Sequence, residues 1–197
     1  MSDKNNIRLE KRVAIFGYSE ANPEDQLYKD AFHTAKLLAE NGFVVVDGAG
    51  PGVMRAASEG AKIANGRTIG VTFEAAGMTN FEGRDPKNPV DEEIILPNYV
   101  ERTLKLMELG DAYIIFNGGT GTVSEFGMAW GLAKLHFGHH KPLVLFGGWW
   151  HEILESMGKH MMIRDSALKV YRIVNTPAKA VEKIIDLIGK PETISKK

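Results

Sequence analysis

Three glycine-containing loops in this sequence carry residue types that bind phosphate. They are Gly17-Tyr18-Ser19, the segment 47–52 (Asp-Gly-Ala-Gly-Pro-Gly) and the segment 117–122 (Asn-Gly-Gly-Thr-Gly-Thr). Glycines let the backbone approach an anion closely, and free backbone N–H groups at a helix N-terminus attract it. Threonine hydroxyls add further donors. The residues that we predict to bind phosphate or substrate are Gly17, Ser19, Gly48, Gly50, Gly118, Gly119, Thr120, Gly121 and Thr122.

Glu125 and Arg102 are charged residues whose positions near the glycine loops indicate a functional role. Glu125 lies one helical step after the third loop, so its carboxylate can point at whatever that loop holds. A carboxylate repels phosphate, and we therefore interpret it as a group beside a developing positive charge or an attacking water. Arg102 and Lys105 lie in the first turns of a predicted helix, where the helix dipole disfavours cations. This placement favours anion binding. The structural alternatives are, for Glu125, an acidic residue favoured by the dipole and, for Arg102 and Lys105, a solvated face paired with Glu101 or Glu108.

The glycine loops do not match the two best-known nucleotide-binding patterns. A Walker loop ends in Gly-Lys followed by Ser or Thr, and the dinucleotide pattern Gly-x-Gly-x-x-Gly belongs to the first strand–helix unit. Gly48, Gly50 and Gly52 have a different spacing and belong to the second unit. A P-loop NTPase and an NAD dehydrogenase are therefore disfavoured. The alternative is that the glycines only make tight turns.

Alternating apolar runs and helical patterns predict the elements that position these loops. Unbroken apolar runs at 12–16, 43–46 and 68–72 indicate buried strands, and the segments 25–41 and 53–64 between them have helical spacing. Strands without polar alternation, separated by single helices, indicate parallel pairing with both faces covered. We therefore predict an α/β protein with a three-layer Rossmann-like fold, in which helices flank a mostly parallel sheet.

The second half of the chain continues this alternation after an irregular segment at 74–93. This segment is rich in Gly, Pro and charges, and is expected to be a loop that shapes a site or a subunit contact. The elements expected after it are a short strand at 93–96, a helix at 98–109, a strand at 112–116, a helix at about 122–135, a strand at 142–146, a helix at about 150–160 and a final helix at 177–187. We expect one domain over 1–197, with a polar extension at about 1–11 and a frayed tail at about 191–197.

Composition narrows the class of protein. The 24 Lys and Arg nearly cancel the 25 Asp and Glu, and the net charge of -1 predicts neither a nucleic-acid nor a membrane partner. The absence of cysteine excludes disulfides, a thiol nucleophile and cysteine-ligated metal sites. The N-terminus lacks the apolar region of a signal peptide and no run is long enough to span a membrane, so a cytoplasmic protein is expected.

Two further clusters are interpreted as structural. The segment 136–140 (His-Phe-Gly-His-His) lacks a carboxylate at metal-site spacing, and we expect it to be a surface turn without a metal. Trp149 and Trp150 lie at the sheet edge where they could stack on a base, but capping of the core or a dimer contact is favoured.

The segment from Gly118 to Glu125 resembles the Gly-Gly-x-Gly-Thr-x-x-Glu motif of the LOG ("Lonely guy") family. These proteins are cytokinin riboside 5′-monophosphate phosphoribohydrolases, often labelled lysine decarboxylases. The loop from Gly48 to Met54 is similar to a second glycine-rich segment of that family, and Glu101-Arg102 followed by Lys105 is similar to its Glu-Arg-Lys helix. The sequence departs from the family in Asn117, which precedes the motif where the family has proline.

The resemblance implies hydrolysis of the N-glycosidic bond of a nucleoside 5′-monophosphate, giving a free base and ribose 5-phosphate without a cofactor. The resemblance makes Glu125 and Arg102 the predicted catalytic residues. Glu125 would stabilise the ribosyl cation or position water, Arg102 would help hold the nucleotide and support the catalytic step, and the segment 118–122 would bind the phosphate. A homodimer is also implied. The alternative is a non-catalytic nucleotide-binding or nucleotide-sensing module. A pyridoxal-dependent lysine decarboxylase is discounted, because nothing in the sequence independently indicates its Schiff-base lysine.

Overall fold

A computed structural model describes residues 10–74 and 83–191 of the 197-residue chain. Seven strands form one sheet in the order β4-β3-β2-β1-β5-β6-β7, and every neighbouring pair is parallel. The strands are β1 (Arg12–Phe16), β2 (Val44–Asp47), β3 (Thr68–Phe73), β4 (Glu92–Leu96), β5 (Ala112–Ile115), β6 (Leu143–Phe146) and β7 (Tyr171–Val174).

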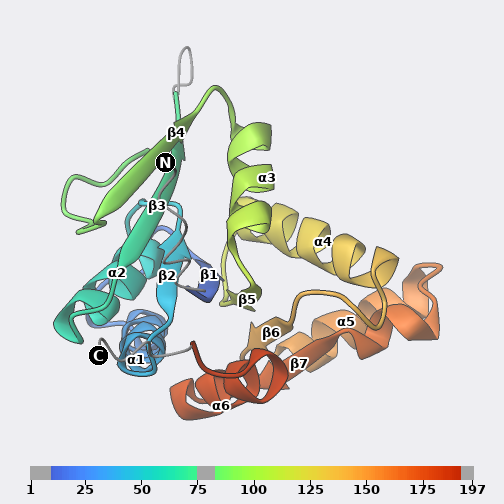
Figure 1. Cartoon of the computed structure of the whole chain (residues 1–197). Coiled ribbons are helices and arrows are strands. Elements are labelled where there is room, and N and C mark those ends of the chain that lie inside the picture. The colour runs from blue at the N-terminus through green and yellow to red at the C-terminus, as the bar shows by residue number, and fades with distance from the viewer. Residues whose placement is uncertain (1–9, 75–82, 192–197) are drawn as a thin grey trace, which may run out of the picture.

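Helices cover both faces of this sheet, which confirms the predicted three-layer α/β class (Figure 1). They are α1 (Gln26–Glu40), α2 (Val53–Ile63), α3 (Tyr99–Leu109), α4 (Thr120–Leu135), α5 (Trp150–His160) and α6 (Pro177–Ile188). Successive residues of β1 point to opposite faces, so Val13 and Ile15 pack under α1, α2 and α6, whereas Ala14 and Phe16 pack under α3, α4 and α5. Both sets are almost fully buried.

The end of the chain contains elements that the sequence analysis missed. A short 3-10 helix (Asp165–Lys169) leads into β7, which pairs with β6 at the edge of the sheet. Only Val174 of this strand is buried, and Arg172 is exposed. An edge strand of four residues that buries one side chain lacks the apolar run from which the other strands were predicted.

The irregular segment at 74–93 was predicted as a loop, and its described residues are hydrogen-bonded to β3 and to the loop after β2. Asp91 accepts hydrogen bonds from the backbone N–H and the hydroxyl of Thr68. The buried Asn88 side chain donates to the carbonyl of Gly50 at 2.9 Å. The strand expected at 93–96 is β4 and begins one residue earlier, whereas residues 75–82 lie outside the described part.

The order of the strands places a binding edge at β1. The chain moves from β1 to β2 on one side of the sheet, and it later returns to place β5 on the other side of β1. The helices that follow β1 and β5 therefore run to different parts of the sheet, and the carboxyl end of β1 is the point where the strand order reverses. Ligands of open parallel sheets bind at such a point.

Candidate functional site

A cavity of about 530 Å³ opens at the carboxyl ends of β1, β3 and β5. Its volume lies in the range of small-molecule sites, about 300–1,000 Å³. It is lined by the loop after β1, the first turn of α2, the end of β3, the start of α3 and the first turns of α4. The cavity thus lies where the strand order reverses.

The loop after β2 is fixed by a buried carboxylate. Asp47 is fully buried and accepts hydrogen bonds from the backbone N–H of Ala49 at 2.6 Å and the hydroxyl of Ser58 at 2.7 Å. Burial raises the pKa of Asp47 to about 6, against the lowering effect of these hydrogen bonds. Gly52, with φ of +65°, lies so close to the loop after β1 that a Cβ there would be 2.3 Å from the carbonyl oxygen of Tyr18.

The loop after β5 delivers the N-terminus of α4 to the cavity. The helix begins at Thr120, two residues earlier than predicted, and the N-cap residue Gly119 offers no side chain to its first backbone N–H groups. These donors face the cavity edge formed by residues 119–122. A Cβ on Gly118 would lie 2.1 Å from the Thr122 hydroxyl, which explains the glycine behind that edge.

Arg102 of α3 and Glu125 of α4 form a buried ion pair at the wall of the cavity. Arg102 Nη1 lies 3.1 Å from Glu125 Oε1, and the two side chains are 10% and 8% exposed. Arg102 Nε donates to the carbonyl of Val71 at 3.0 Å, which ties the guanidinium to β3. Burial raises the pKa of Glu125 to about 7, although the charge and the hydrogen bond of Arg102 lower it.

The environment of this pair contains residues that the sequence analysis did not select. The Tyr99 ring lies 5.9 Å from the Arg102 guanidinium and packs edge-on against Phe73, and its hydroxyl lies 2.5 Å from Ser124 Oγ. Tyr99, Phe73, Met54, Tyr18 and Arg84 all line the cavity. Tyr99 stands three residues before Arg102, one helical turn away, and that spacing was the available signal.

The structure brings most predicted site residues to one cavity. Its walls include Gly17, Ser19, Gly48, Arg102, Gly119, Thr120, Gly121, Thr122 and Glu125. Gly50 and Gly118 do not line it and instead shape the loops behind it. Lys105 points to Glu108 of its own helix, at 2.9 Å.

Trp149 and Trp150 do not line the cavity either. Trp150 is buried against Phe126 of α4 with ring centroids 4.7 Å apart, and Trp149 stacks on Trp150. Within residues 10–74 and 83–191, no group of three His, Asp or Glu side chains is placed to hold a metal ion. No helix in the same part of the chain is long and apolar enough to cross a membrane.

Comparisons with known proteins identify the family of this chain. The sequence profile of the SLOG cluster4 family matches residues 10–168. A cytokinin riboside 5′-monophosphate phosphoribohydrolase of Mycobacterium tuberculosis is 30% identical over 153 residues, which are 77% of this chain and 78% of that protein. The resemblance to LOG proteins inferred from the motif is thereby confirmed.

Solved structures with the same fold have more than one role. A molybdenum cofactor binding protein from Rippkaea orientalis has a TM-score of 0.68 and 26% identity, covering 91% of this chain and 98% of that one. DNA processing protein A from Helicobacter pylori has a TM-score of 0.58 and 19% identity, covering 89% and 80%. The second likeness concerns the fold alone.

The contact between Gly48 and Arg102 yields a test of the site geometry. A Cβ on Gly48 would lie 1.8 Å from Arg102 Nη2 and 2.7 Å from Met54 Sδ. Gly48→Ala should therefore displace the guanidinium and raise the pKa of Glu125 above about 7, because the ion pair that lowers it is weakened. Carbon NMR of the Glu125 carboxyl group measures this shift.

Gly119→Ala is the matched control, since a Cβ at this loop position meets no atom within 4 Å. It should leave the pKa of Glu125 in the ligand-free protein unchanged. An unchanged Glu125 pKa in Gly48→Ala would mean that the guanidinium does not depend on the space beside Gly48.

Proposed function

The chain belongs to the SLOG cluster4 family, and on that premise we propose that it hydrolyses the N-glycosidic bond of a nucleoside 5′-monophosphate. The products are a free base and ribose 5-phosphate. The observation that carries the proposal is the buried Arg102–Glu125 pair on the wall of a cavity that also contains the N-terminus of α4. The 30% sequence identity with a cytokinin riboside 5′-monophosphate phosphoribohydrolase supports the same reaction.

The phosphate of the substrate is assigned to the edge formed by Gly119, Thr120, Gly121 and Thr122. Backbone N–H groups of the first turn of α4 and the two threonine hydroxyls are donors there. Binding of the 5′-phosphate at this edge brings the ribose toward Glu125, which lies one turn and a half further along the same helix. The helix thus sets the separation between the phosphate and the catalytic carboxylate.

Glu125 acts on the sugar carbon that carries the base. As the C1′–N bond breaks, its electron pair leaves with the base and positive charge develops on the ribose ring. The Glu125 carboxylate stabilises this charge, or it takes a proton from the water that bonds to C1′, as carboxylates do in glycoside hydrolysis. In either case the hydroxyl of the water ends on C1′ and its proton ends on the departing base. Arg102 holds the carboxylate in place and keeps part of its population ionised near neutral pH.

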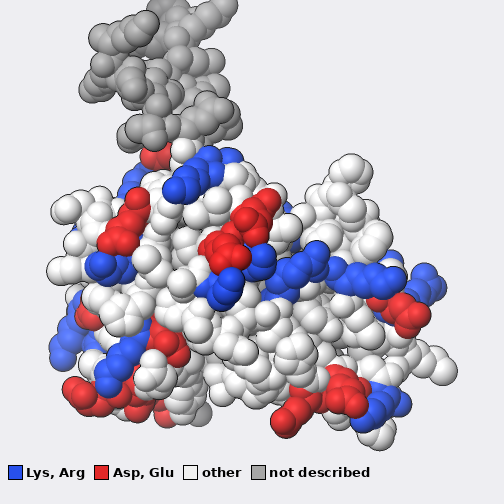
Figure 2. Space-filling view, turned by 90° about the horizontal axis from the view of Figure 1, so that it is seen from below, with Lys and Arg blue, Asp and Glu red and all other residues white. Residues whose placement is uncertain are grey.

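The second candidate function is a non-catalytic binding module. The likeness to a molybdenum cofactor binding protein favours it, because that protein binds a ligand with the same fold. The DNA role of the more distant neighbour has less support. On the face seen in Figure 2, basic and acidic side chains lie side by side, whereas nucleic-acid sites gather cations on one face.

A homodimer is the third part of the proposal. Apolar side chains are exposed near the N-termini of α3 and α4, which lie together through the Tyr99–Ser124 contact. Val100, Leu104 and Val123 are 60%, 51% and 60% exposed. Val100 and Leu104 are one helical turn apart on the same face of α3. Exposed apolar patches mark interaction surfaces, and a second copy of this chain would cover this one.

A panel of nucleoside 5′-monophosphates tests the reaction. Chromatography should detect free base and ribose 5-phosphate from at least one monophosphate and none from the corresponding nucleoside, because the phosphate edge orients the substrate. Glu125→Gln should retain binding and reduce turnover by about 10²- to 10⁴-fold. Binding without release by the wild type would replace the hydrolase by the binding module.

The pH dependence of kcat/KM tests the role of Glu125. Its raised pKa of about 7 means that the ionised form gains population as the pH rises through neutrality, so kcat/KM should rise over about pH 6 to 8 and then level off. Asp47→Asn is the control because Asp47, with a pKa raised to about 6, is the other buried carboxylate beside the site. If the rise of kcat/KM with pH disappears in Asp47→Asn, the ionisation belongs to Asp47 and the assignment to Glu125 is wrong.

Sedimentation measures the proposed dimer. Leu104→Glu should shift the protein toward monomers at concentrations where the wild type is dimeric, because a carboxylate would be buried unpaired in the interface. Ile63→Glu changes a residue of similar exposure (65%) on α2 and should leave the assembly intact. A monomeric wild type would remove the dimer from the proposal.

A further inference from the structure

A second hollow adjoins the main cavity and shares part of its wall. It measures about 320 Å³ and lies between the loop after β1, the start of α2 and the segment that precedes β4. Ser19, Gly83 and Arg84 line both hollows. A ligand bound in the main cavity therefore lies next to this side pocket.

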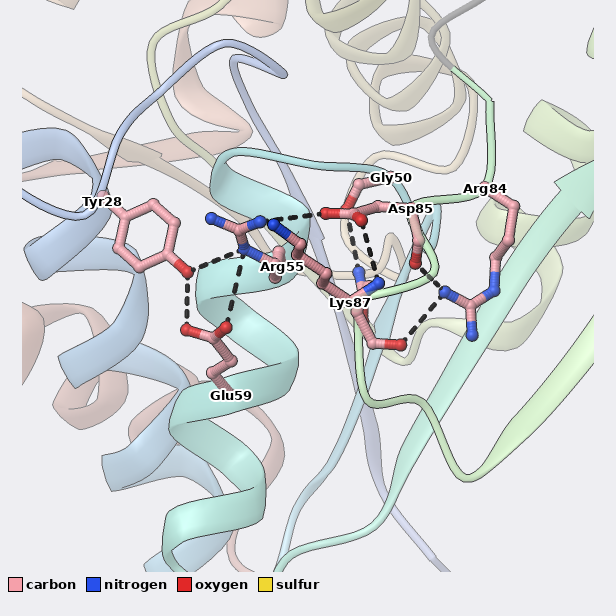
Figure 3. Close-up of polar contacts among 8 residues, drawn as sticks. Tyr28, Gly50, Arg55, Glu59, Arg84, Asp85 and Lys87 are labelled. Atoms are coloured by element: carbon pink, nitrogen blue, oxygen red, sulfur yellow. Dashed lines mark hydrogen bonds and ion pairs between the residues drawn. The ribbon is translucent and has the colours of Figure 1, made fainter.

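The side pocket is built around two anchored arginines (Figure 3). Arg55 on α2 lies between the Tyr28 hydroxyl, at 3.2 Å, and the carboxylates of Glu59, at 3.5 Å, and Asp85, at 3.2 Å. Its side chain is only 20% exposed. Since Asp85 belongs to the segment before β4, the Arg55–Asp85 pair ties that segment to α2 and fixes one wall of the pocket.

Arg84 is held on the opposite side by three contacts. Its Nε lies 3.1 Å from Glu93 Oε2, and its Nη1 donates to the backbone carbonyls of Asp85 and of Asn88. Both guanidinium groups are therefore placed before any ligand arrives. Groups that are already ordered lose less conformational entropy on binding.

The groups that remain available in the pocket are mainly cationic donors. Among the described residues, neither Arg55 Nη2 nor Arg84 Nη2 has a hydrogen-bond partner, and Figure 3 draws no contact from either. The exposed Lys87 ammonium also lines the pocket and has no partner in the described ranges. Three unpartnered cationic donors favour an anion with several acceptor oxygens.

The two acidic residues of the pocket are partly engaged. Asp85 Oδ2 accepts from Arg55, and Asp85 Oδ1 accepts from the backbone N–H of Lys87 at 2.9 Å. Glu20 Oε2 accepts from the Tyr18 hydroxyl at 2.8 Å. Glu20 thus remains the one carboxylate of the pocket with an oxygen that has no partner in the described part of the chain.

We propose that the side pocket binds a second phosphoryl group, carried by the same nucleotide whose 5′-phosphate occupies the start of α4. This inference rests on the placement of the nucleotide in the proposed function. It predicts that a nucleotide with a phosphoryl group in addition to its 5′-phosphate binds more tightly than the corresponding 5′-monophosphate. Arg55, Arg84 and Lys87 donate to that group, while Ser19 and Gly83 form the passage between the two sites.

Calorimetry with defined probes tests the proposal. Adenosine 5′-monophosphate is compared with adenosine 3′,5′-bisphosphate, adenosine 2′,5′-bisphosphate and adenosine diphosphate. At least one doubly phosphorylated probe should bind about tenfold more tightly than the monophosphate, the scale of one additional charged contact. Equal or weaker binding of all three would overturn the proposal.

Variants of residues outside the main cavity locate the gain. Lys87→Glu should abolish the advantage of the second phosphoryl group and change the affinity for the monophosphate by less than about twofold. Lys159→Glu, the control with the same change in net charge, alters an exposed lysine on α5 and should retain the advantage. Glu20→Gln should increase it, because it removes the carboxylate from the pocket. An advantage that survives Lys87→Glu would overturn the proposal.

Inorganic phosphate separates the two sources of the anion. If free phosphate at millimolar concentration binds together with the monophosphate, Lys87→Glu prevents this, and no doubly phosphorylated probe gains affinity, the pocket is an independent anion site and the claim of one extended ligand is wrong. Because binding is measured, the hydrolase is judged separately. Hydrolysis without a bisphosphate advantage rejects this inference alone, whereas the advantage without hydrolysis rejects the proposed reaction alone.

Discussion

The buried pairing of Arg102 with Glu125 is the interaction on which the site depends. A carboxylate that is 8% exposed loses most of its hydration, so the guanidinium beside it must supply what water no longer does. The guanidinium in turn needs the Val71 carbonyl on β3 and the empty space at Gly48 after β2. One ion pair therefore constrains two helices and two strands, and it places a carboxylate with a pKa of about 7 against the cavity.

The second constraint is the close approach of the loops after β1, β2 and β5, which Gly52 permits because it has no side chain. Gly52 touches the backbone at Tyr18, and Tyr18 N–H donates to the carbonyl of Asn117 at 2.9 Å. The loops after β1, β2 and β5 are thus bonded to one another in sequence. Because a Cβ at Gly52 would meet the Tyr18 carbonyl at 2.3 Å, a larger residue there would separate the walls of the cavity.

The sequence was informative wherever local chemistry decides the structure. Apolar runs predicted the strands β1 to β6, including the Ile94-Ile95-Leu96 run of the edge strand β4, and β7 was missed because Arg172 interrupts its apolar residues. The glycine loops and Glu125 were found because glycines follow the predicted strands, and because Glu125 lies at a fixed distance from the start of the next helix. Two partners of Arg102 were not predictable in this way, since Val71 and Met54 meet it only through the crossing of β3, α2 and α3. Arg84 was not predicted either, because it lies in an irregular segment and its position depends on contacts with Glu93 and Asn88.

The position of Glu125 also bears on the choice between a catalyst and a binding module. A site made only to hold a phosphate ester gains from N–H groups and cations, and a carboxylate next to them weakens anion binding by repulsion. In the same cavity wall, Glu125 is buried, where its ionised form costs free energy that only Arg102 offsets among the described residues. Two costs, one in stability and one in affinity, thus fall on a single side chain. In a hydrolase the same negative charge is useful, because it stabilises a developing ribosyl cation or activates a water. A carrier gains nothing from this charge, and the presence of Glu125 therefore favours the hydrolase.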